Sequence, residues 1–379
     1  MSITTRPTRM NEPSNSGYRD RLERLRKRLR GSNLDGTILV PGPNLKYYAG
    51  GDSLMLERIF LFFVPTEGDP HLVAPDFECG PYRDGVVKIV THEWNDNEGP
   101  SSALQGLSDQ LELKGRWGLE GRVPFRFLSP LMKYANPEWV DAEPILQSIR
   151  ETKDDGEIRL LKRAASILSK SYVKIPNILR PGMTEIELSR KLYEILYSNG
   201  AESIFVVLVQ AGERAADPHS LPSTRKLKKN EPVVIDIAST FSGYYADITR
   251  TVSVGHVNKR FEDLYGKVLE AQERAIKTSK PGLTVGSVDE AARDYLREKN
   301  LGGYFTSRTG HGLGLEVHEA PYIVAGGSEV LRPGMVYTVE PGVYIADDLG
   351  IRIEDDVLLT ENGHQVVTSM VPKEFGWWS

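Results

Sequence analysis

Cysteine is almost absent from this chain of 379 residues, because Cys79 is the only one. A single cysteine excludes an internal disulfide framework and a metal cluster held by thiolates. The residues next to Cys79 do not include the histidine that would activate a nucleophile. We therefore predict that Cys79 is a small buried core residue.

The chain also lacks a long apolar run and a large charge of either sign. No stretch of about 18 apolar residues occurs, and residues 1–9 have no apolar signal segment, which predicts a cytoplasmic protein without a membrane partner. The formal net charge of -5 gives no electrostatic reason to expect nucleic acid as a partner. The basic run at 21–30 has leucines at helical spacing, so it is interpreted as the exposed face of an amphipathic helix.

The length and the pattern of the chain predict two domains. Residues 1–16 are polar and are expected to be a disordered tail. Residues 17–150 alternate between strand and helix patterns, which is typical of an α/β domain. A charged linker at 149–157 then leads into a second domain at 155–379. The expected elements are helices at 18–30, 103–113 and 154–178, and strands at 37–40, 59–64, 71–74, 86–90 and 117–120.

A repeat organises the second domain. Residues 180–184 (Arg-Pro-Gly-Met-Thr) and residues 280–284 (Lys-Pro-Gly-Leu-Thr) each precede a predicted helix. The first helix has a capping box, Thr184-x-x-Glu, and ends at Gly200. For the second helix the pattern predicts a capping box at Ser287-x-x-Glu and an end near Gly302.

The strands that follow the two helices match as well. Residues 227–236 align without a gap with residues 331–340, so that Asp236 matches Glu340, and Asp247 then matches Glu354. Asp236 and Asp247 lie on two predicted strands joined by a turn at Ser242-Gly243. An aspartate inside an apolar strand needs a partner, and two on adjacent strands repel unless a cation lies between them.

His311 lies between the second predicted helix and the strand that carries Glu340, and it has a glycine on each side. Glycine allows another backbone to approach closely and leaves room around the imidazole ring. Four carboxylates and one imidazole would then come together, and two divalent cations would offset the negative charge. Oxygen-rich ligation favours Mn²⁺, Co²⁺, Fe²⁺ or Mg²⁺ over a structural zinc site. The five residues are Asp236, Asp247, His311, Glu340 and Glu354.

These motifs resemble those of the pita-bread metallopeptidases, which include Xaa-Pro dipeptidases (prolidases), Xaa-Pro aminopeptidases and methionine aminopeptidases. The resemblance covers residues 155–379 and implies an α+β catalytic domain with a pseudo-twofold repeat. Residues 17–150 resemble, more loosely, the α/β N-terminal domain of the creatinase/prolidase type, which methionine aminopeptidases usually lack. The motifs are the Asp-x6-Gly-x3-Asp hairpin, Gly-His-Gly-x-Gly-x3-His-Glu, Val-Glu-Pro-Gly-x-Tyr, Gly-Ile-Arg-Ile-Glu-Asp, and Asn-Leu-Lys-Tyr-Tyr-Ala-Gly at 44–50.

The resemblance implies a role for each matched residue. The five residues of the cluster match the family's ligands for two divalent metal ions, expected to be Mn²⁺ or Co²⁺, with Zn²⁺ or Fe²⁺ as alternatives. Glu340 would also act as the general base. His219 and His318 would hold the substrate carbonyl and stabilise the tetrahedral intermediate. Tyr344 matches a tyrosine common in the proline-specific members and is expected to support the site. Arg352 lies two residues before Glu354, so on a strand the two side chains would share one face, where Arg352 could orient Glu354 or bind a carboxylate bidentately.

Two residues depart from the family pattern. Ala238 stands where the family more often has glycine, and a strand tolerates alanine there. Tyr322 stands where many prolidases carry an arginine that binds the C-terminal carboxylate of the dipeptide. Tyrosine offers one hydroxyl and no charge, so the group that binds this carboxylate is left open.

The predicted function is metal-dependent hydrolysis of the bond between an N-terminal residue and proline. An Xaa-Pro dipeptidase is favoured by length and domain plan, and an Xaa-Pro aminopeptidase that acts on longer peptides is the alternative. Two remote alternatives are a creatinase-like enzyme without metal and a non-catalytic binding module. Both are disfavoured because all five ligand positions are occupied by suitable side chains. A homodimer is expected from the family.

Overall fold

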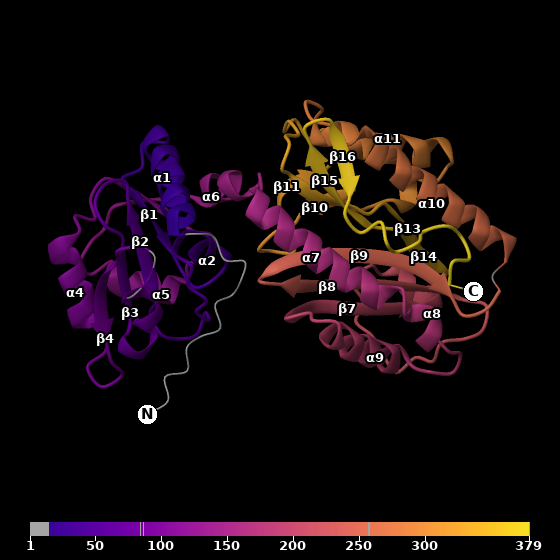
Figure 1. Ribbon diagram of the computed structural model, residues 1–379, viewed down its shortest axis with the longest axis horizontal. Coiled ribbons are helices and arrows are strands. Elements are labelled where there is room, and N and C mark those ends of the chain that lie inside the picture. The colour runs from indigo at the N-terminus through magenta and orange to yellow at the C-terminus, as the bar shows by residue number, and fades with distance from the viewer. Residues whose placement is uncertain (1–14, 84, 86, 257, 379) are drawn as a thin grey trace. The chain divides into compact units, whose positions relative to one another are not determined.

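The computed structural model describes residues 15–83, 85, 87–256 and 258–378 of the chain. The chain divides into two compact units, Met1–Arg150 and Glu151–Ser379, here called unit 1 and unit 2 (Figure 1). Most of the expected tail at 1–16 lies outside the described residues, and residues 15 and 16 begin a helix. No described helix is long and apolar enough to cross a membrane.

Unit 1 is built on one six-stranded mixed sheet with the order β4-β3-β2-β1-β5-β6. Strands β1 and β2 pair antiparallel, whereas β5 and β6 continue the sheet in parallel. Apolar side chains of the strands pack against helices, with Trp117 and Phe127 fully buried. The strands are Gly36–Leu39 (β1), Leu61–Pro65 (β2), His71–Pro75 (β3), Val90–Trp94 (β4), Arg116–Leu119 (β5) and Glu138–Asp141 (β6).

The strand predicted at 86–90 lies further along the chain, at Val90–Trp94. The structure starts β4 at Val90, where parallel pairing with His71 of β3 begins, and residues 84 and 86 lie outside the described part of the chain. Cys79 is fully buried, as predicted, and burial raises the pKa of its thiol to about 12. The helices of unit 1 are Asn15–Gly31 (α1), Pro43–Ala49 (α2), Gly80–Arg83 (α3), Ser101–Gln110 (α4), Phe125–Leu131 (α5) and Glu143–Arg150 (α6), with a 3-10 turn at Asp76–Glu78 (η1).

The motif at 44–50 forms the helix α2 and its C-cap, which strand and turn patterns did not predict. Asn44 donates a hydrogen bond of 2.8 Å to Glu120 and accepts one of 2.8 Å from Arg150. Glu120 is buried, and burial raises the pKa of its carboxyl to about 7. These contacts tie α2 to the sheet and to the last helix of unit 1.

Unit 2 contains three small sheets with helices packed on their outer faces (Figure 1). The sheets have the orders β7-β8-β9, β11-β10-β12-β15-β16 and β13-β14. The strands are Ser203–Ala211 (β7), Pro232–Phe241 (β8), Tyr244–Ser253 (β9), Gly310–Gly312 (β10), Glu319–Ile323 (β11), Val336–Val339 (β12), Gly342–Ile345 (β13), Leu349–Arg352 (β14), Asp355–Thr360 (β15) and Gly363–Val366 (β16). Its helices are Asp155–Tyr172 (α7), Ile175–Ile178 (α8), Glu185–Ser198 (α9), Lys259–Thr278 (α10) and Val285–Glu298 (α11), with 3-10 turns at Gly212–Ala216 (η2) and Gly302–Tyr304 (η3).

The repeat is present as two matching substructures. Gly182 donates to the carbonyl of Leu227 over 2.8 Å, and Gly282 donates to the carbonyl of Leu331 over 2.9 Å. Both glycines have a φ of 86°, which favours residues without a side chain. The two helices that follow, α9 and α11, therefore start from the same backbone geometry.

The helix caps agree with the sequence in the first repeat and differ in the second. Thr184 and Glu187 form the predicted capping box of α9. The box predicted at Ser287 is wrong, because the N-cap of α11 is Thr284 and its side chain accepts a hydrogen bond from the amide of Ser287. Ser287 thus takes the place of Glu187 in the repeat. α11 ends at Glu298, before the expected end near Gly302.

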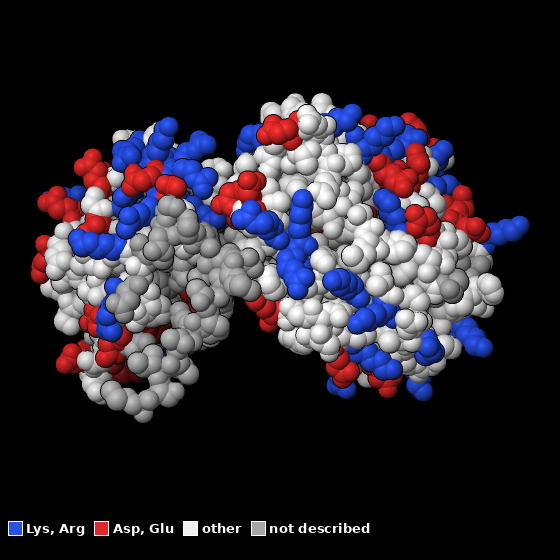
Figure 2. All heavy atoms as spheres, viewed as in Figure 1, with Lys and Arg blue, Asp and Glu red and all other residues white. Residues whose placement is uncertain are grey.

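The helix expected at 154–178 is two helices. Val173 caps α7, and Pro176 lies in the first turn of α8. Amides in the first turn have no acceptor within the helix, so the amide hydrogen that proline lacks is not missed there. The apolar side of α7 packs on β8 and β9, while Lys and Arg side chains gather over its exposed side (Figure 2). The charged segment before α7 is not an open linker, because the side chains of Glu151 and Lys153 are buried.

Residues 371–378 close the core of unit 2 beside α10. The ring of Trp378 is buried and lies 5.6 Å from that of Tyr265 between ring centroids. Trp377 lies 6.4 Å from the ring of Tyr172 on α7. Trp378 therefore packs into the core of unit 2, and Trp377, which is partly buried, packs against that core.

Candidate metal centre

The hairpin of β8 and β9 places two carboxylates on one face. The pair is antiparallel with Ala238 opposite Asp247 and Asp236 opposite Thr249. Because residues two apart on a strand share a face, Asp236, Ala238 and Asp247 all point the same way. Ser242 and Gly243 both have positive φ values, as a two-residue hairpin turn requires. Ala238, the departure from the family pattern, lies buried in the middle of β8.

His311 lies in the middle of β10, between β11 and β12. A Cβ on Gly310 would overlap the carbonyl oxygen of Thr338, and one on Gly312 would overlap that of Ala320. The flanking glycines thus let two neighbouring strands approach His311 closely, as the sequence predicted. The ring nitrogen Nδ1 lies 3.1 Å from the carbonyl of Gly312 and donates there, so Nε2 is the ring nitrogen that faces the other ligands.

Glu340 and Glu354 enter the site from two connecting segments. Glu340 follows the end of β12 and accepts a hydrogen bond of 3.0 Å from the hydroxyl of Thr338. Glu354 lies between β14 and β15, and its amide donates to the carbonyl of Thr249 over 3.0 Å. The Thr249 hydroxyl also donates to the Glu354 carboxylate over 2.6 Å.

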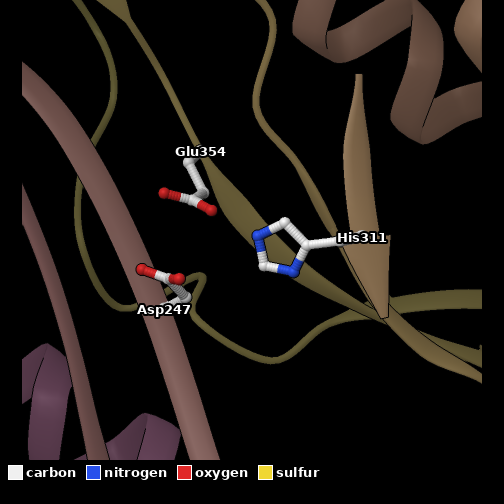
Figure 3. Close-up of side chains that lie close together, drawn as sticks. All are labelled: Asp247, His311 and Glu354. Atoms are coloured by element: carbon white, nitrogen blue, oxygen red, sulfur yellow. The ribbon is translucent and has the colours of Figure 1, made fainter. Parts of the chain in front are cut away.

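The five predicted ligands converge at one place. Ligand atoms of Asp247, His311 and Glu354 lie within 4.8 Å of one another, and Figure 3 shows their side chains pointing toward a common centre. His311 Nε2 lies 3.1 Å from Glu340 Oε1. Asp236 faces the same cavity from β8.

The electrostatics of the cluster fit divalent metal ions. Burial, together with the charges of neighbouring carboxylates, raises the pKa of Asp247 and Glu354 well above the usual range. Burial also raises the pKa of Glu340, but the contact with His311, the charge of Arg352 and the Thr338 hydrogen bond together outweigh it, and the net shift is downward. The Asp247 oxygen Oδ1 is buried and has no hydrogen-bond partner within the described structure. An oxygen-rich, negatively charged set with one imidazole and an unpartnered carboxylate oxygen suits hard or borderline divalent cations.

Arg352 ends β14, and its side chain lines the same cavity as that of Glu354. The guanidinium donates to Asp236 over 2.6 Å and to the Tyr344 hydroxyl over 2.9 Å. Its Nε donates over 3.2 Å to the hydroxyl of Thr249, which in turn donates to Glu354.

The cluster lines a cavity of about 220 Å³ in unit 2. His219, on the loop after η2, and His318, between β10 and β11, reach the same cavity. The rings of His311 and His318 meet edge to face with centroids 4.1 Å apart. Desolvation and the nearby charges of His311 and Arg308 lower the pKa of His318 to about 4. Ser307, Tyr344 and Arg352 also line it, and apolar side chains form the rest of the wall, namely Phe205, Val206, Leu208, Pro218, Leu221 and Val317.

Tyr322 is the one predicted site residue that does not line this cavity. It lies opposite His311 in the pairing of β10 with β11, and the Arg308 guanidinium lies over its ring. Sequence reasoning missed Thr249 and Thr338, the hydroxyls that orient Glu354 and Glu340. Each lies two residues from a ligand on the same strand or its extension, and this spacing was the available signal.

Comparison with known proteins agrees with this geometry. A family model described as "Metallopeptidase family M24" matches residues 159–361, more than half of the chain. The chain belongs to metallopeptidase family M24. A second model, described as "Creatinase/Prolidase N-terminal domain", matches residues 21–152. The resemblance stated from the motifs is therefore confirmed for both parts.

Relatives within the M24 family have similar length and fold. The chain is 34% identical over 336 residues to a protein named probable dipeptidase PepE from Mycobacterium tuberculosis, covering 88% of this chain and 89% of that one. A crystal structure of a prolidase from Thermococcus sibiricus superposes with a TM-score of 0.89 at 31% identity, covering 94% and 98% of the two chains. An X-Pro aminopeptidase from Thermotoga maritima superposes with a TM-score of 0.79 at 31% identity, covering 93% and 98%. The pita-bread fold of unit 2, and the N-terminal domain before it, are thus shared with solved members of the family.

Proposed function

We propose that this M24 metallopeptidase is an Xaa-Pro dipeptidase, which hydrolyses the bond between an N-terminal residue and a following proline. The observation that carries the proposal is the convergence of Asp247, His311 and Glu354 in a small cavity with apolar walls. A cavity of about 220 Å³ suits the end of a peptide rather than a folded segment. The similarity to a prolidase along nearly the whole chain supports the same choice.

Five side chains would hold two divalent metal ions, for which we propose Mn²⁺ or Co²⁺, with Zn²⁺ or Fe²⁺ as alternatives. When bound, such ions polarise the scissile carbonyl and lower the pKa of water, which supplies a nucleophile at neutral pH. His311 would offer Nε2, because Nδ1 is engaged by the Gly312 carbonyl. Asp236, Asp247, Glu340 and Glu354 would offer carboxylate oxygens.

Glu340 would transfer a proton from the attacking water to the proline nitrogen. Its pKa is shifted downward on balance, so it is ionised at neutral pH and can accept a proton from the attacking water. The water oxygen bonds to the carbonyl carbon, and the carbon–nitrogen bond breaks as Glu340 passes the proton to the proline nitrogen. The Thr338 hydroxyl keeps the carboxylate oriented through a hydrogen bond of 3.0 Å.

His219 and His318 would bind the substrate carbonyl. With its pKa near 4, His318 is neutral at pH 7, so it donates an N–H hydrogen bond to the developing oxyanion and does not protonate it. Arg352 would act by holding Asp236 and Tyr344 in place, since its guanidinium already donates to both.

The proposal is tested with protein stripped of metal and reloaded with Mn²⁺ or Co²⁺. The substrates are Ala-Pro, Ala-Pro-Ala-Ala and Ala-Ala. Cleavage of Ala-Pro in preference to the other two is the expected result, and metal analysis should return about two ions per chain. Turnover of none of the three would contradict a proline-specific peptidase.

An Xaa-Pro aminopeptidase is the second candidate. Tyr322 favours it, because the position that many prolidases fill with an arginine carries no charge here, and a solved X-Pro aminopeptidase shares the fold. Preference for Ala-Pro-Ala-Ala over Ala-Pro would establish this alternative.

We also propose, from the family resemblance, a cytoplasmic homodimer without nucleic-acid or membrane partners. Light scattering on the purified protein tests the dimer, because a mass near 42 kDa would contradict it and twice that mass is expected. Fractionation of cells that make the protein tests the location.

A further inference from the structure

The cavity contains one permanent cation, and that cation is already paired. Of the described residues that line it, Arg352 alone is an arginine or lysine. Its guanidinium donates to Asp236, Tyr344 and Thr249. A substrate carboxylate that entered beside four acidic side chains would therefore need a different cation.

Arg308 is such a cation. It follows Ser307, which lines the cavity, and precedes the β10 strand that carries His311. Its side chain is half-buried, and within the described structure its guanidinium makes no hydrogen bond or ion pair. An arginine has five N–H donors in a planar fork that matches the two oxygens of a carboxylate. All five donors of Arg308 are thus available to a ligand.

The ring of Tyr322 orients Arg308. The guanidinium carbon lies 4.9 Å from the ring centroid, in the range of a cation–π contact, which uses none of the N–H donors. Tyr322 lies directly opposite His311 in the pairing of β10 with β11, so the two side chains share one face of the sheet. Tyr322 therefore holds the Arg308 charge on the face that bears the metal ligand.

The position of Arg308 relative to His318 agrees with this arrangement. The Arg308 guanidinium lies over the ring of Tyr322, which pairs with His311, and the ring centroids of His311 and His318 are 4.1 Å apart. His318 is the residue proposed to bind the carbonyl of the scissile bond. In an Xaa-Pro dipeptide the terminal carboxylate is only one residue beyond that bond. A group near His318 can reach it.

We propose that Arg308, held by the Tyr322 ring, binds the C-terminal carboxylate of the substrate and so selects dipeptides. This inference rests on the proposed dipeptidase function. In this arrangement the Tyr322 ring does not contact the carboxylate. It supports the Arg308 guanidinium, which supplies the charge from the segment just before β10.

The test compares Ala-Pro with its C-terminal amide in steady-state kinetics. For Arg308→Met we expect the KM for Ala-Pro to rise about 10- to 100-fold, the range for losing a hydrogen-bonded charge partner. The KM for the amide should change less than about 3-fold, since the amide offers no charge to pair. Arg308→Lys should fall between the two, because it keeps the charge and loses the fork. Inhibition by free proline, which carries the same carboxylate, should weaken in parallel with the rise in KM.

Two further variants sharpen the result. Tyr322→Leu removes the ring and should lower the preference for Ala-Pro over the amide by less than Arg308→Met does. Arg297→Met, which removes an exposed guanidinium paired with Asp294 on α11, should leave both substrates unchanged. Thermal melting and metal content establish that each variant is folded and loaded, and Arg308→Lys supplies the result should the methionine variant fail to fold.

The outcomes separate the two proposals. If the unaltered enzyme cleaves Ala-Pro and Arg308→Met keeps the same ratio of Ala-Pro to amide, the dipeptidase function stands and the role of Arg308 is overturned. If the unaltered enzyme cleaves neither Ala-Pro nor longer Xaa-Pro peptides, the function itself fails. If it prefers the amide and longer peptides, it is an aminopeptidase and selection through Arg308 is also refuted.

Discussion

Asp247 lies in surroundings that are unfavourable for a carboxylate. Its side chain is only 6% exposed, its amide donates to Asp356 over 3.1 Å, and its own oxygen Oδ1 has no partner among the described residues. A buried, unpaired carboxylate oxygen is costly unless a ligand uses it. The arrangement is unfavourable for the protein alone and favourable for a protein that binds cations.

Replacing Asp247 by Asn should therefore separate metal binding from folding. Changing residues that merely orient a metal ligand costs about 10- to 100-fold in affinity, so losing a direct ligand should cost more than about 100-fold in metal affinity and in kcat/KM. Metal analysis after dialysis and a dipeptide assay measure both losses.

The matched control is Glu290→Gln, which neutralises an exposed carboxylate on α11. It should bind metal and turn over substrate as the unaltered protein does. Full metal content in Asp247→Asn would show that Asp247 is not a ligand.

At this scale the sequence was informative where the chemistry required an unusual residue. An aspartate inside an apolar strand and a histidine between two glycines are conspicuous, and the structure brings them together as expected. The partners of Arg352 could not be predicted, because Asp236 and Arg352 are over 100 positions apart in the chain and meet only through tertiary packing. Thr249 is likewise an ordinary strand residue until Glu354 packs against it.

Among the elements, the loop between β10 and β11 depends on a buried ion pair. Lys153 Nζ lies 2.8 Å from Glu319 Oε1, with the two side chains 1% and 3% exposed. Glu319 follows His318, and a Cβ on Gly314 in the same loop would overlap the Glu319 carboxylate. The carbonyl of Gly314 also accepts a hydrogen bond of 2.8 Å from the amide of Tyr245 on β9. The loop that carries His318 is thus fixed to the segment before α7 through Lys153 and to β9 through Tyr245.

Removing one partner of this pair should lower the stability of the protein strongly. Lys153→Met removes the buried cation beside Glu319, and we expect a loss of about 3–5 kcal/mol in the free energy of unfolding. The double variant Lys153→Met with Glu319→Leu should regain part of this loss, because neither charge remains. Urea unfolding followed by circular dichroism measures all three proteins.

An exposed pair serves as the control for Lys153. Lys267→Met breaks the pair with Asp263 on α10, which should cost no more than about 0.5 kcal/mol. Equal losses for Lys153→Met and Lys267→Met would mean that the buried pair does not support the loop.

Elements with strong local signals were predicted well, and those set by long-range pairing were not. The hairpin of β8 and β9 and the cap of α9 follow from residues within a few positions of each other. The start of β4 depends on parallel pairing with β3, and its register has no local signal. The charges at 149–157 indicated a linker because their buried partners, such as Glu319, lie far along the chain.

For the whole molecule, the acid cluster predicts how stability depends on pH when metal is absent. The pKa values of Asp247, Glu354 and Asp356 are all raised, first by burial, so the metal-free folded state holds protons that the unfolded chain releases. Stability from these groups is complete below the ordinary carboxyl pKa of about 4 and is lost as the pH rises through the higher folded values.

The melting temperature of metal-free protein should therefore fall from pH 5 to pH 8 relative to that of metal-loaded protein. The comparison at each pH cancels groups elsewhere, such as His71, whose pKa is lowered to about 4 by burial and acts with the opposite sign. Asp247→Asn in the metal-free state should show a shallower fall. Parallel pH curves with and without metal would contradict this account.

The two repeats of unit 2 divide the cluster between them, and this division has a consequence for motion. Asp236 and Asp247 belong to the first repeat, whereas His311, Glu340 and Glu354 belong to the second, and one apolar core runs through both. Removing the metal ions by chelation restores the repulsion among the carboxylates where the two repeats meet. The two repeats cannot separate without exposing that core. Amide hydrogen exchange should therefore accelerate on strands of both repeats together, as one cooperative unit, rather than at the loops around the cavity alone.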